Sequence, residues 1–585
     1  MGLLACLAGV VILAVGAESA ERPAASHLLP DNTLAYVRIE SAAALRDRFW
    51  QTAIGRISSD PQMKPLLGQL YTSLATAYQR IEQRIGLPLD KLLSILQGEV
   101  CVAVVPPEQG QPQVVALLEV GERLPDARVL VQRLEEQLIG RGVARNREQV
   151  GGTEVTIFQP PGARAQRFSV FEKDAVFVVS SDADLAKQLL AVWNGGANVR
   201  TLADNRRFTS IMNRCQRAGG ERPHAVWYVD PIELLRRAGR GRLSTEAGLL
   251  ILESLGLDGL EGFGGSLTMA TAEFDMLLDA HLLLKSPKQG VLKMIAMESG
   301  DTTPEPWVPH DVARYMTMHW NVQQTYAELS RLYDTIRGES AWENSVLRPI
   351  SDQLGLDLPR DVVDAAQGRV TLLTWMESPA RVNSAARLLA FKLQDAAATR
   401  QVLDRTVSRF PDRFSPESLS GVSYYRAVAG QPSRGSDEQT VRRPQPCIGI
   451  LGEYLAVSDS VALLRQAIMA QADASQSLAE QLDFQLIASK ISRQVPGGQA
   501  GLVSFSRPEE GLRVLYELAN APQTRTRIRE GAANNRALRA LNDALNQHPL
   551  PPFAVLSQYL APAGGMLTSD ETGLHYTSFT LRREP

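Results

Sequence analysis

Cysteine is scarce in this chain, which has only 4 among its 585 residues. Cys6 lies in an N-terminal apolar run, and the other three are Cys101, Cys215 and Cys447. Three cysteines cannot build a framework of several disulfides, and none stands in a CxxC pair or near a histidine, as zinc ligands usually do. We therefore expect no metal site and no cofactor. We interpret the three cysteines as small buried hydrophobic residues.

An excess of charge of one sign is also missing. The net charge is −3, the isoelectric point is about 6.3, and no long basic or acidic block interrupts the chain. Proteins that bind nucleic acids usually carry a basic face, so we expect no nucleic-acid partner. The hydrophobic fraction of 44% and the charged fraction of 21% are typical of a globular protein. The length exceeds the roughly 250–300 residues that one core supports, which predicts at least two domains.

Long hydrophobic runs are absent except at the N-terminus, where residues 3–17 read LLACLAGVVILAVGA. This run is short for a membrane span, which needs ~20 apolar residues, and is typical of a signal peptide with cleavage after Ala17. Because no Lys or Arg precedes the run, a short uncleaved anchor is the alternative for residues 1–17. We predict a protein of the cell envelope, either periplasmic or secreted. Membrane contact is expected only if the segment stays attached.

The common catalytic motifs are missing as well. The sequence contains no HExxH, no GxSxG and no Walker-type phosphate loop. Its glycine-rich stretch GLDGLEGFGGS (256–266) follows a predicted helix and enters a predicted strand, which is the reverse of a dinucleotide-binding loop. We interpret these glycines as turn residues.

What the chain does contain is a repetition. GLPLDKLLSILQGEV at 86–100 resembles GLDLPRDVVDAAQGRV at 355–370, and further pairs of similar blocks follow in the same order. The residue after the shared Gln-Gly is Glu99 in one copy and Arg369 in the other. A catalytic position would not be expected to invert its charge, so the copies share packing and turns rather than reactive groups. Similar blocks with variable loops between them are typical of a duplicated domain.

The repetition predicts four segments. These are a signal peptide at 1–17, a first repeat at 28–298, a linker at 299–306 and a second repeat at 307–585. Strands are expected in adjacent pairs, as in the meander 153–159, 167–172 and 175–180, and a helix is expected from Pro125 to Gly140. Each repeat is therefore predicted to be an α+β lobe with a largely antiparallel, mixed sheet and helices mainly on one face.

The alternation in LAYVRIE is typical of a half-buried strand. Ala35, Val37 and Ile39 alternate there with Tyr36, Arg38 and Glu40.

The best candidate constellation for acid–base chemistry is HAVWYVDP (224–231). On a strand, His224, Tyr228 and Asp230 would project to one face, and together they offer a base, a phenol and a carboxylate. The aligned second-copy residues are Gly501, Phe505 and Arg507, and we interpret Phe505 and Arg507 as surface positions. The alternative is a polar sheet face, with Asp230 and Pro231 starting a helix. The sequence favours this alternative because the trio lacks a nucleophile or metal.

Several blocks resemble a family of uncharacterised exported bacterial proteins with a domain of unknown function. They are LLPDNTLAYVRIESAAALRDRF, the GLxL…QGEV turn and GGTEVTIF…FVVSSDADLAKQLL, and members of this family typically open with LP…T.AYV. The resemblance implies an α+β fold, export and no assigned activity. It carries over no functional residues.

The sequence favours a non-catalytic binding or scaffolding protein, whose partner would be an envelope protein or a polymer. Two alternatives stay open. One is a hydrolase-type enzyme with its site near His224, Tyr228 and Asp230 or between the lobes. The other is a binder of an apolar ligand held between sheet and helices.

Overall fold

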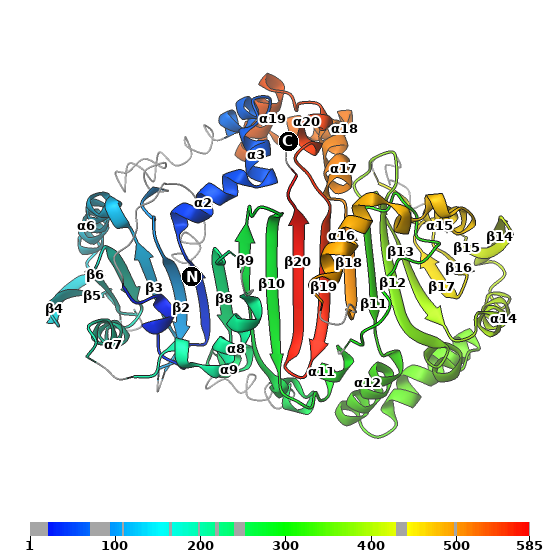
Figure 1. Cartoon of the computed structure of the whole chain (residues 1–585), viewed down its shortest axis with the longest axis horizontal. Coiled ribbons are helices and arrows are strands. Elements are labelled where there is room, and N and C mark those ends of the chain that lie inside the picture. Colours follow the sequence, from blue (N-terminus) through cyan, green and yellow to red (C-terminus); the bar gives the residue numbers. More distant parts are fainter. Residues whose placement is uncertain are drawn as a thin grey trace.

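The protein is an α+β molecule built on one antiparallel sheet of 20 strands, seen in a computed structural model (Figure 1). The structure describes residues 22–583 except 71–93, 108–109, 163–165, 197–198, 217–220, 239–247, 249–251, 296, 429–440 and 496–499. The predicted signal peptide therefore lies outside the described residues. Within them, no helix combines the length and apolar character needed to cross a bilayer.

The strands fall into two sets of ten. The first set is β1 Ala35–Ile39, β2 Val100–Val105, β3 Gln113–Glu119, β4 Ala144–Val150, β5 Thr153–Gln159, β6 Phe168–Lys173, β7 Val176–Ser180, β8 Ala225–Val229, β9 Leu260–Met269 and β10 Phe274–Leu284. The second set is β11 Arg314–His319, β12 Ala366–Met376, β13 Ala385–Leu393, β14 Phe414–Leu419, β15 Val422–Ala427, β16 Cys447–Leu451, β17 Tyr454–Ser458, β18 Leu502–Ser506, β19 Ala563–Asp570 and β20 Gly573–Leu581.

Both sets pair in the same order. The first runs β4-β5-β6-β7-β3-β2-β1-β8-β9-β10, and the second runs β14-β15-β16-β17-β13-β12-β11-β18-β19-β20. The two series meet where β10 pairs with β20, so the sheet continues from one half into the other (Figure 1). The ten strands of each half therefore have the same order in the sheet.

The described helices lie mostly on one side of this sheet and at its upper and lower rims. In the first half they are α2 Ala42–Gln51, α3 Ala53–Ser59, α6 Leu124–Gly140, α7 Ala183–Trp193, α8 Arg206–Cys215, α9 Pro231–Ala238 and α11 Val291–Met294. In the second half they are α12 Val322–Arg337, α13 Arg348–Leu354, α14 Ala396–Val407, α15 Val461–Ala472, α16 Leu482–Ser492, α17 Pro508–Asn520, α18 Pro522–Gly531, α19 Arg536–Gln547 and α20 Phe553–Ser557. Helices α8 and α16 lie in front of the central strands in the view of Figure 1.

The face under α8 and α16 holds the main cores, and we call it the covered face. Phe208 of α8 packs edge-on against Tyr36 of β1 and Tyr228 of β8, with ring centroids 5.5 and 5.6 Å away. Phe484 of α16 makes the same two contacts, with Tyr315 and Phe505. Phe505 is 1% exposed, so its interpretation as a surface position is wrong, because the aromatic pattern is repeated in the second core.

The opposite face, which we call the open face, carries exposed apolar side chains. Val37 is 52% exposed while Tyr36 is 1% exposed, so strand β1 buries its aromatic residue rather than its valine. Phe263 and Met276 are each 37% exposed, and Val457 is 41% exposed. Direct pairing places further apolar residues on this face, among them Val102, Trp227, Leu278, Leu567, Leu502, Met316, Met318 and Leu372. At its outer end in the first half, α6 covers the same face.

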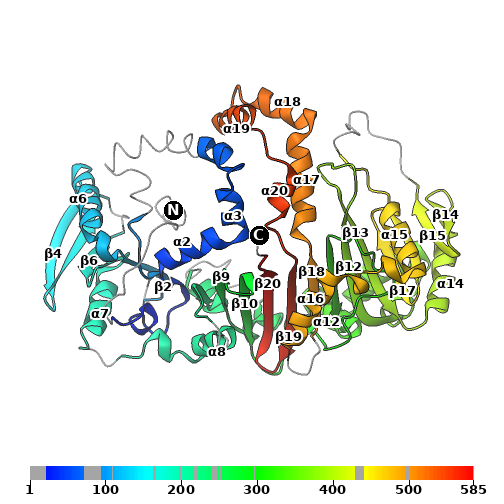
Figure 2. The same ribbon diagram turned by 45° about the horizontal axis from the view of Figure 1, so that its top comes forward.

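A second contact between the halves is the helical bridge, defined by α3, the following residues 60–70, and α17 to α20. Met63 and Leu66 pack there against Ala544, Leu545 and Leu556. The bridge lies at one rim of the sheet in Figures 1 and 2. The two halves are thus joined both by strand pairing and by a shared apolar cluster.

Four details depart from the sequence prediction. All pairings among the described strands are antiparallel rather than mixed, and the two lobes share one sheet. The polar segment Ala144–Val150 forms β4, which the sequence did not predict because it has no alternation of hydrophobic and polar residues. Residues of the predicted linker 299–306 pack into the second half, where the Glu305 carboxylate is 3.1 Å from the Arg369 guanidinium and Glu305 is only 4% exposed.

Candidate functional site

A group of mostly buried polar side chains lies where the halves meet. On β10 and β20, Asp279 pairs with Thr577 and His281 pairs with His575. The period of two along each strand directs all four side chains to the covered face, next to the C-terminal turn of α8. We call Asp279, His281, His575 and Thr577 the junction cluster.

Three of the four residues of the junction cluster are buried, and the His575 side chain is 18% exposed. Asp279 is 3% exposed, and its Oδ1 accepts a hydrogen bond from Thr577 Oγ1 at 2.6 Å. His575 Nε2 lies 3.6 Å from the same carboxylate oxygen. His281 is fully buried, and burial together with nearby His575 and Arg214 lowers its pKa to about 4. The imidazole of His281 is therefore neutral near pH 7.

A short series of polar groups connects the junction cluster to the surface. His281 Nε2 lies 3.5 Å from Thr572 Oγ1, which in turn donates to Asp570 Oδ1 at 2.6 Å. The Arg214 guanidinium of α8 donates to Asp570 and, at 3.2 Å, to Thr572 Oγ1. Asp570 therefore binds the β19–β20 turn to α8 and stands at the outer end of the series.

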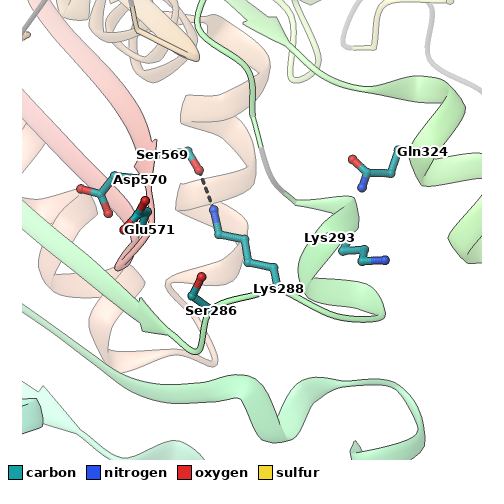
Figure 3. Close-up of a pocket in the computed structure, with 7 residues that line it drawn as sticks. All are labelled: Ser286, Lys288, Lys293, Gln324, Ser569, Asp570 and Glu571. Atoms are coloured by element: carbon teal, nitrogen blue, oxygen red, sulfur yellow. Dashed lines mark hydrogen bonds between the residues drawn. The ribbon is translucent and has the colours of Figure 1, made fainter.

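Beyond Asp570 lies an open pocket of about 480 Å³ (Figure 3). It is lined by Ser286, Lys288, Lys293, Gln324, Ser569, Asp570 and Glu571. Lys288 Nζ donates to Ser569 Oγ at 2.7 Å, as the dashed line shows, and partial burial lowers the Lys288 pKa. Lysine and carboxylate groups face the same space, so the pocket offers mixed polar contacts rather than a site for one charge.

The structure separates the three residues that the sequence proposed for acid–base chemistry. His224 precedes β8, and its Nδ1 accepts a hydrogen bond from the Met269 amide at 3.1 Å. Tyr228 is 2% exposed within the core, where burial raises its pKa. Asp230 follows the other end of β8, so the strand lies between His224 and Asp230. No single reacting group could touch all three.

Asp230 instead has two structural partners. Its Oδ1 accepts from the Glu233 amide at 3.0 Å in the first turn of α9, and its Oδ2 accepts from Arg207 at 2.6 Å. This agrees with the alternative in which Asp230 starts a helix. A second pocket, of about 450 Å³, is lined in part by Tyr228, Asp230 and Arg207, where this ion pair already satisfies the carboxylate.

The second half contains the same ion pair with its charges exchanged. Arg507, two residues after Phe505, corresponds to Asp230, two residues after Tyr228. Its guanidinium donates to Asp483 Oδ2 at 2.6 Å, and Asp483 precedes Phe484 as Arg207 precedes Phe208. An ion pair that tolerates exchange of its charges holds α8 or α16 to a strand end. Acid–base chemistry at Asp230 finds no support in this comparison.

Glu99 and Arg369 show a second exchange. Glu99 precedes Val100 at the start of β2 and lies 2.7 Å from Arg22, whereas Arg369 precedes Val370 and lies 3.4 Å from Asp301. Both residues are buried. The charge inversion seen in the sequence thus reflects two versions of one contact between a buried charged residue and the segment that precedes each half.

The described residues contain no group of three or more His, Cys, Asp or Glu side chains arranged to hold a metal ion. Cys101, Cys215 and Cys447 are free thiols and buried, as expected. Burial raises the pKa of Cys215 and of Cys447 to about 12, which leaves both thiols protonated and unreactive at neutral pH.

Sequence reasoning missed the junction cluster. His281 and His575 lie in corresponding strands at unmatched positions, since Gly264 faces His281 while its counterpart Gly564 faces Phe579. The missing information was that the last strand of each half pairs with the other. Only the resulting antiparallel register brings the two histidines face to face.

Fold and site together define a class: an extended α+β scaffold of two similarly connected halves, with its buried charges used in internal contacts. Residues 12–221 match the model of a family described as "Protein of unknown function (DUF3352)". This confirms the resemblance to a family without an assigned function over that part of the chain. No curated protein and no solved structure matches the chain.

Proposed function

We propose that the protein is an exported, non-catalytic binding protein that holds a macromolecular partner on the open face of its sheet. The observation that carries the proposal is the apolar character of this face. Val37, Phe263, Met276 and Val457 are all more than one-third exposed, although they lie on strands rather than on loops.

This pattern is unusual for an antiparallel sheet. Such a sheet commonly packs one face on the core and presents polar side chains to water on the other. Here Trp227, Met316 and Met318 share the open face with the exposed residues. Contiguous apolar surface on a soluble protein commonly marks an interaction site, because covering it removes apolar area from water.

The chemistry of the face indicates its partner. Its strand positions are mostly apolar or carry hydroxyl groups, such as Ser504 and Ser578, and Arg314 and Arg387 share the face in the second half. An uncharged apolar surface of an envelope protein or polymer would fit such a face, whereas a nucleic acid would need many more basic residues there. The net charge of −3 agrees with this choice.

Export is a further part of the proposal. Its support is the fifteen-residue apolar run at 3–17 followed by small residues at the expected cleavage position. Mass spectrometry of the N-terminal peptide from fractionated cells would test it. A peptide starting at Glu18 in the periplasm or medium is expected, and an intact N-terminus in the cytosol would contradict export.

The binding proposal is tested by site-specific photo-crosslinking in cells. A photoreactive residue at Val37 or Phe263 is expected to give a crosslink to one partner, while the same residue at Leu515, which is 63% exposed on α17, gives none. Phe263→Glu should then abolish the crosslink from position 37, because binding of the partner would bury the new carboxylate and remove its water.

An equal yield from positions 37 and 515, or a partner retained by Phe263→Glu, would overturn the assignment of the open face. Turnover of a substrate by the purified protein, lost in His224→Ala without loss of stability, would instead favour the hydrolase alternative.

A further inference from the structure

The junction cluster is a place where one proton can alter the connection between the halves. β10 and β20 are joined by backbone pairing along their length, with Asp279, His281 and the paired His575 and Thr577 at its centre. His281 Nδ1 is buried and has no hydrogen-bond partner among the described residues, and the same holds for His575 Nδ1. Neither ring is therefore fixed in a charged state by a complete set of acceptors.

The carboxylates nearby already have partners. Asp279 accepts from Thr577 and lies beside His575. Asp570 is held by Arg214 and by Thr572. Strand β9 places Gly264 opposite His281, and α8 contributes Arg214 and the buried thiol of Cys215. Two acidic groups, Asp279 and Asp570, and two basic groups, His575 and Arg214, thus surround the imidazole, and Arg214 belongs to α8.

We propose that His281 and His575 form an acid-sensitive latch between the two halves: protonation of His281 breaks the Asp570–Arg214 contact and loosens the pairing of β10 with β20. A charged imidazole at a fully buried position needs a carboxylate or water. A carboxylate becomes free for His281 only when Asp570 turns away from Arg214, and water reaches His281 only when the β19–β20 turn opens. The latch is independent of the partner-binding proposal.

The sign of the effect follows from the direction of the pKa shift. Burial lowers the His281 pKa to about 4 from an ordinary value of 6.5. The latch is therefore closed above pH 6.5 and opens as the pH falls toward 4. An exported protein would meet such a change when its surroundings become acidic.

The second half supplies the matched variant. Phe579 occupies the position that corresponds to His281, and Leu277 the position that corresponds to His575. His281→Phe therefore replaces the imidazole by the residue that the same fold already accommodates in its other copy. His281→Leu is the second variant if the larger ring does not fit, and His310→Gln is a control away from the cluster.

The experiment is hydrogen exchange of the full chain between about pH 7 and about pH 4, corrected for intrinsic exchange rates and read on peptides 274–284 and 573–581. In the wild type and in His310→Gln, opening of both peptides is expected to increase at least about tenfold toward acid. In His281→Phe or His281→Leu the opening of these two peptides should not increase toward acid. An unchanged wild type, or equal opening in wild type and both His281 variants, would overturn the proposal.

Discussion

At the scale of single residues, the molecule reuses positions while exchanging charges. Arg207 and Asp230 in the first half occupy the places of Asp483 and Arg507 in the second. Each pair fixes a helix over the covered face to the end of a strand. The energy of such a pair depends on opposite charges at short distance rather than on which partner is the acid. This accounts for the acid lying at the strand end in the first half and on the helix in the second half.

The exchange predicts the outcome of a charge swap. Arg207→Asp is expected to destabilise the protein by about 1–3 kcal/mol, because it places a second carboxylate beside the buried Asp230. The double variant Arg207→Asp with Asp230→Arg should recover a large part of this loss. Recovery is incomplete because Asp230 also caps α9, a contribution of about 1 kcal/mol. Urea unfolding of the single and double variants measures both effects, and additive losses would show that the exchange is not tolerated.

A second residue-scale prediction concerns pH. Because the folded-state pKa of His281 is lowered to about 4, the unfolded chain takes up its proton first as the pH falls below 6.5. Its contribution to stability is thus present above pH 6.5 and is lost toward pH 4, by up to about 3 kcal/mol. His281→Phe should flatten the dependence of the unfolding free energy on pH across this range. If the unfolding free energy of His281→Phe declines with pH as much as that of the wild type, the acid sensitivity belongs to other groups.

At the scale of elements, local pattern predicted much of the fold. The meander strand at 153–159 coincides with β5, and the helix expected from Pro125 to Gly140 is α6, Leu124–Gly140. Proline at a helix start and alternation in a strand act through neighbouring residues, so the sequence reveals them. Strand β4 was missed because its side chains are mostly exposed and carry no apolar period.

Which face of a strand is buried could not be predicted in the same way. The alternation in β1 does not say whether the set around Val37 or the set around Tyr36 faces the core, and in the structure Tyr36 is buried beneath Phe208. An aromatic ring and an aliphatic side chain both favour burial, so the decision depends on which helix packs against the sheet. The junction cluster depended on a pairing between distant strands, which no local pattern specifies.

Helix capping gives an element-scale prediction. The Asp182 carboxylate accepts hydrogen bonds from the Asp184 and Leu185 amides at 3.0 Å and so starts α7, whose inner face is buried. Asp182→Ala is expected to cost about 1 kcal/mol of stability, since two amide groups lose their acceptor. Asp184→Ala is the control, because this side chain is 94% exposed and should cost only a few tenths. Equal losses in the two variants, measured by thermal unfolding, would contradict the capping role.

At the scale of the whole molecule, the two halves behave as one structural unit in this fold. They share the sheet through β10 and β20, and they share the apolar cluster of the helical bridge. Each half therefore relies on the other to cover a strand edge and an apolar helix surface. Two independent domains would expose both.

This coupling predicts non-additive effects across the bridge. Leu66 is 4% exposed in the first half and Leu545 is 6% exposed in the second, within the same cluster. Either change to alanine should cost about 2–4 kcal/mol, and the double variant less than the sum, because the first cavity already loosens the packing that the second would lose. Leu515→Ala, on the exposed side of α17, should be nearly neutral. Calorimetry should show one transition in every variant. Two transitions with strictly additive losses would mean that the halves unfold independently and that the helical bridge does not couple them.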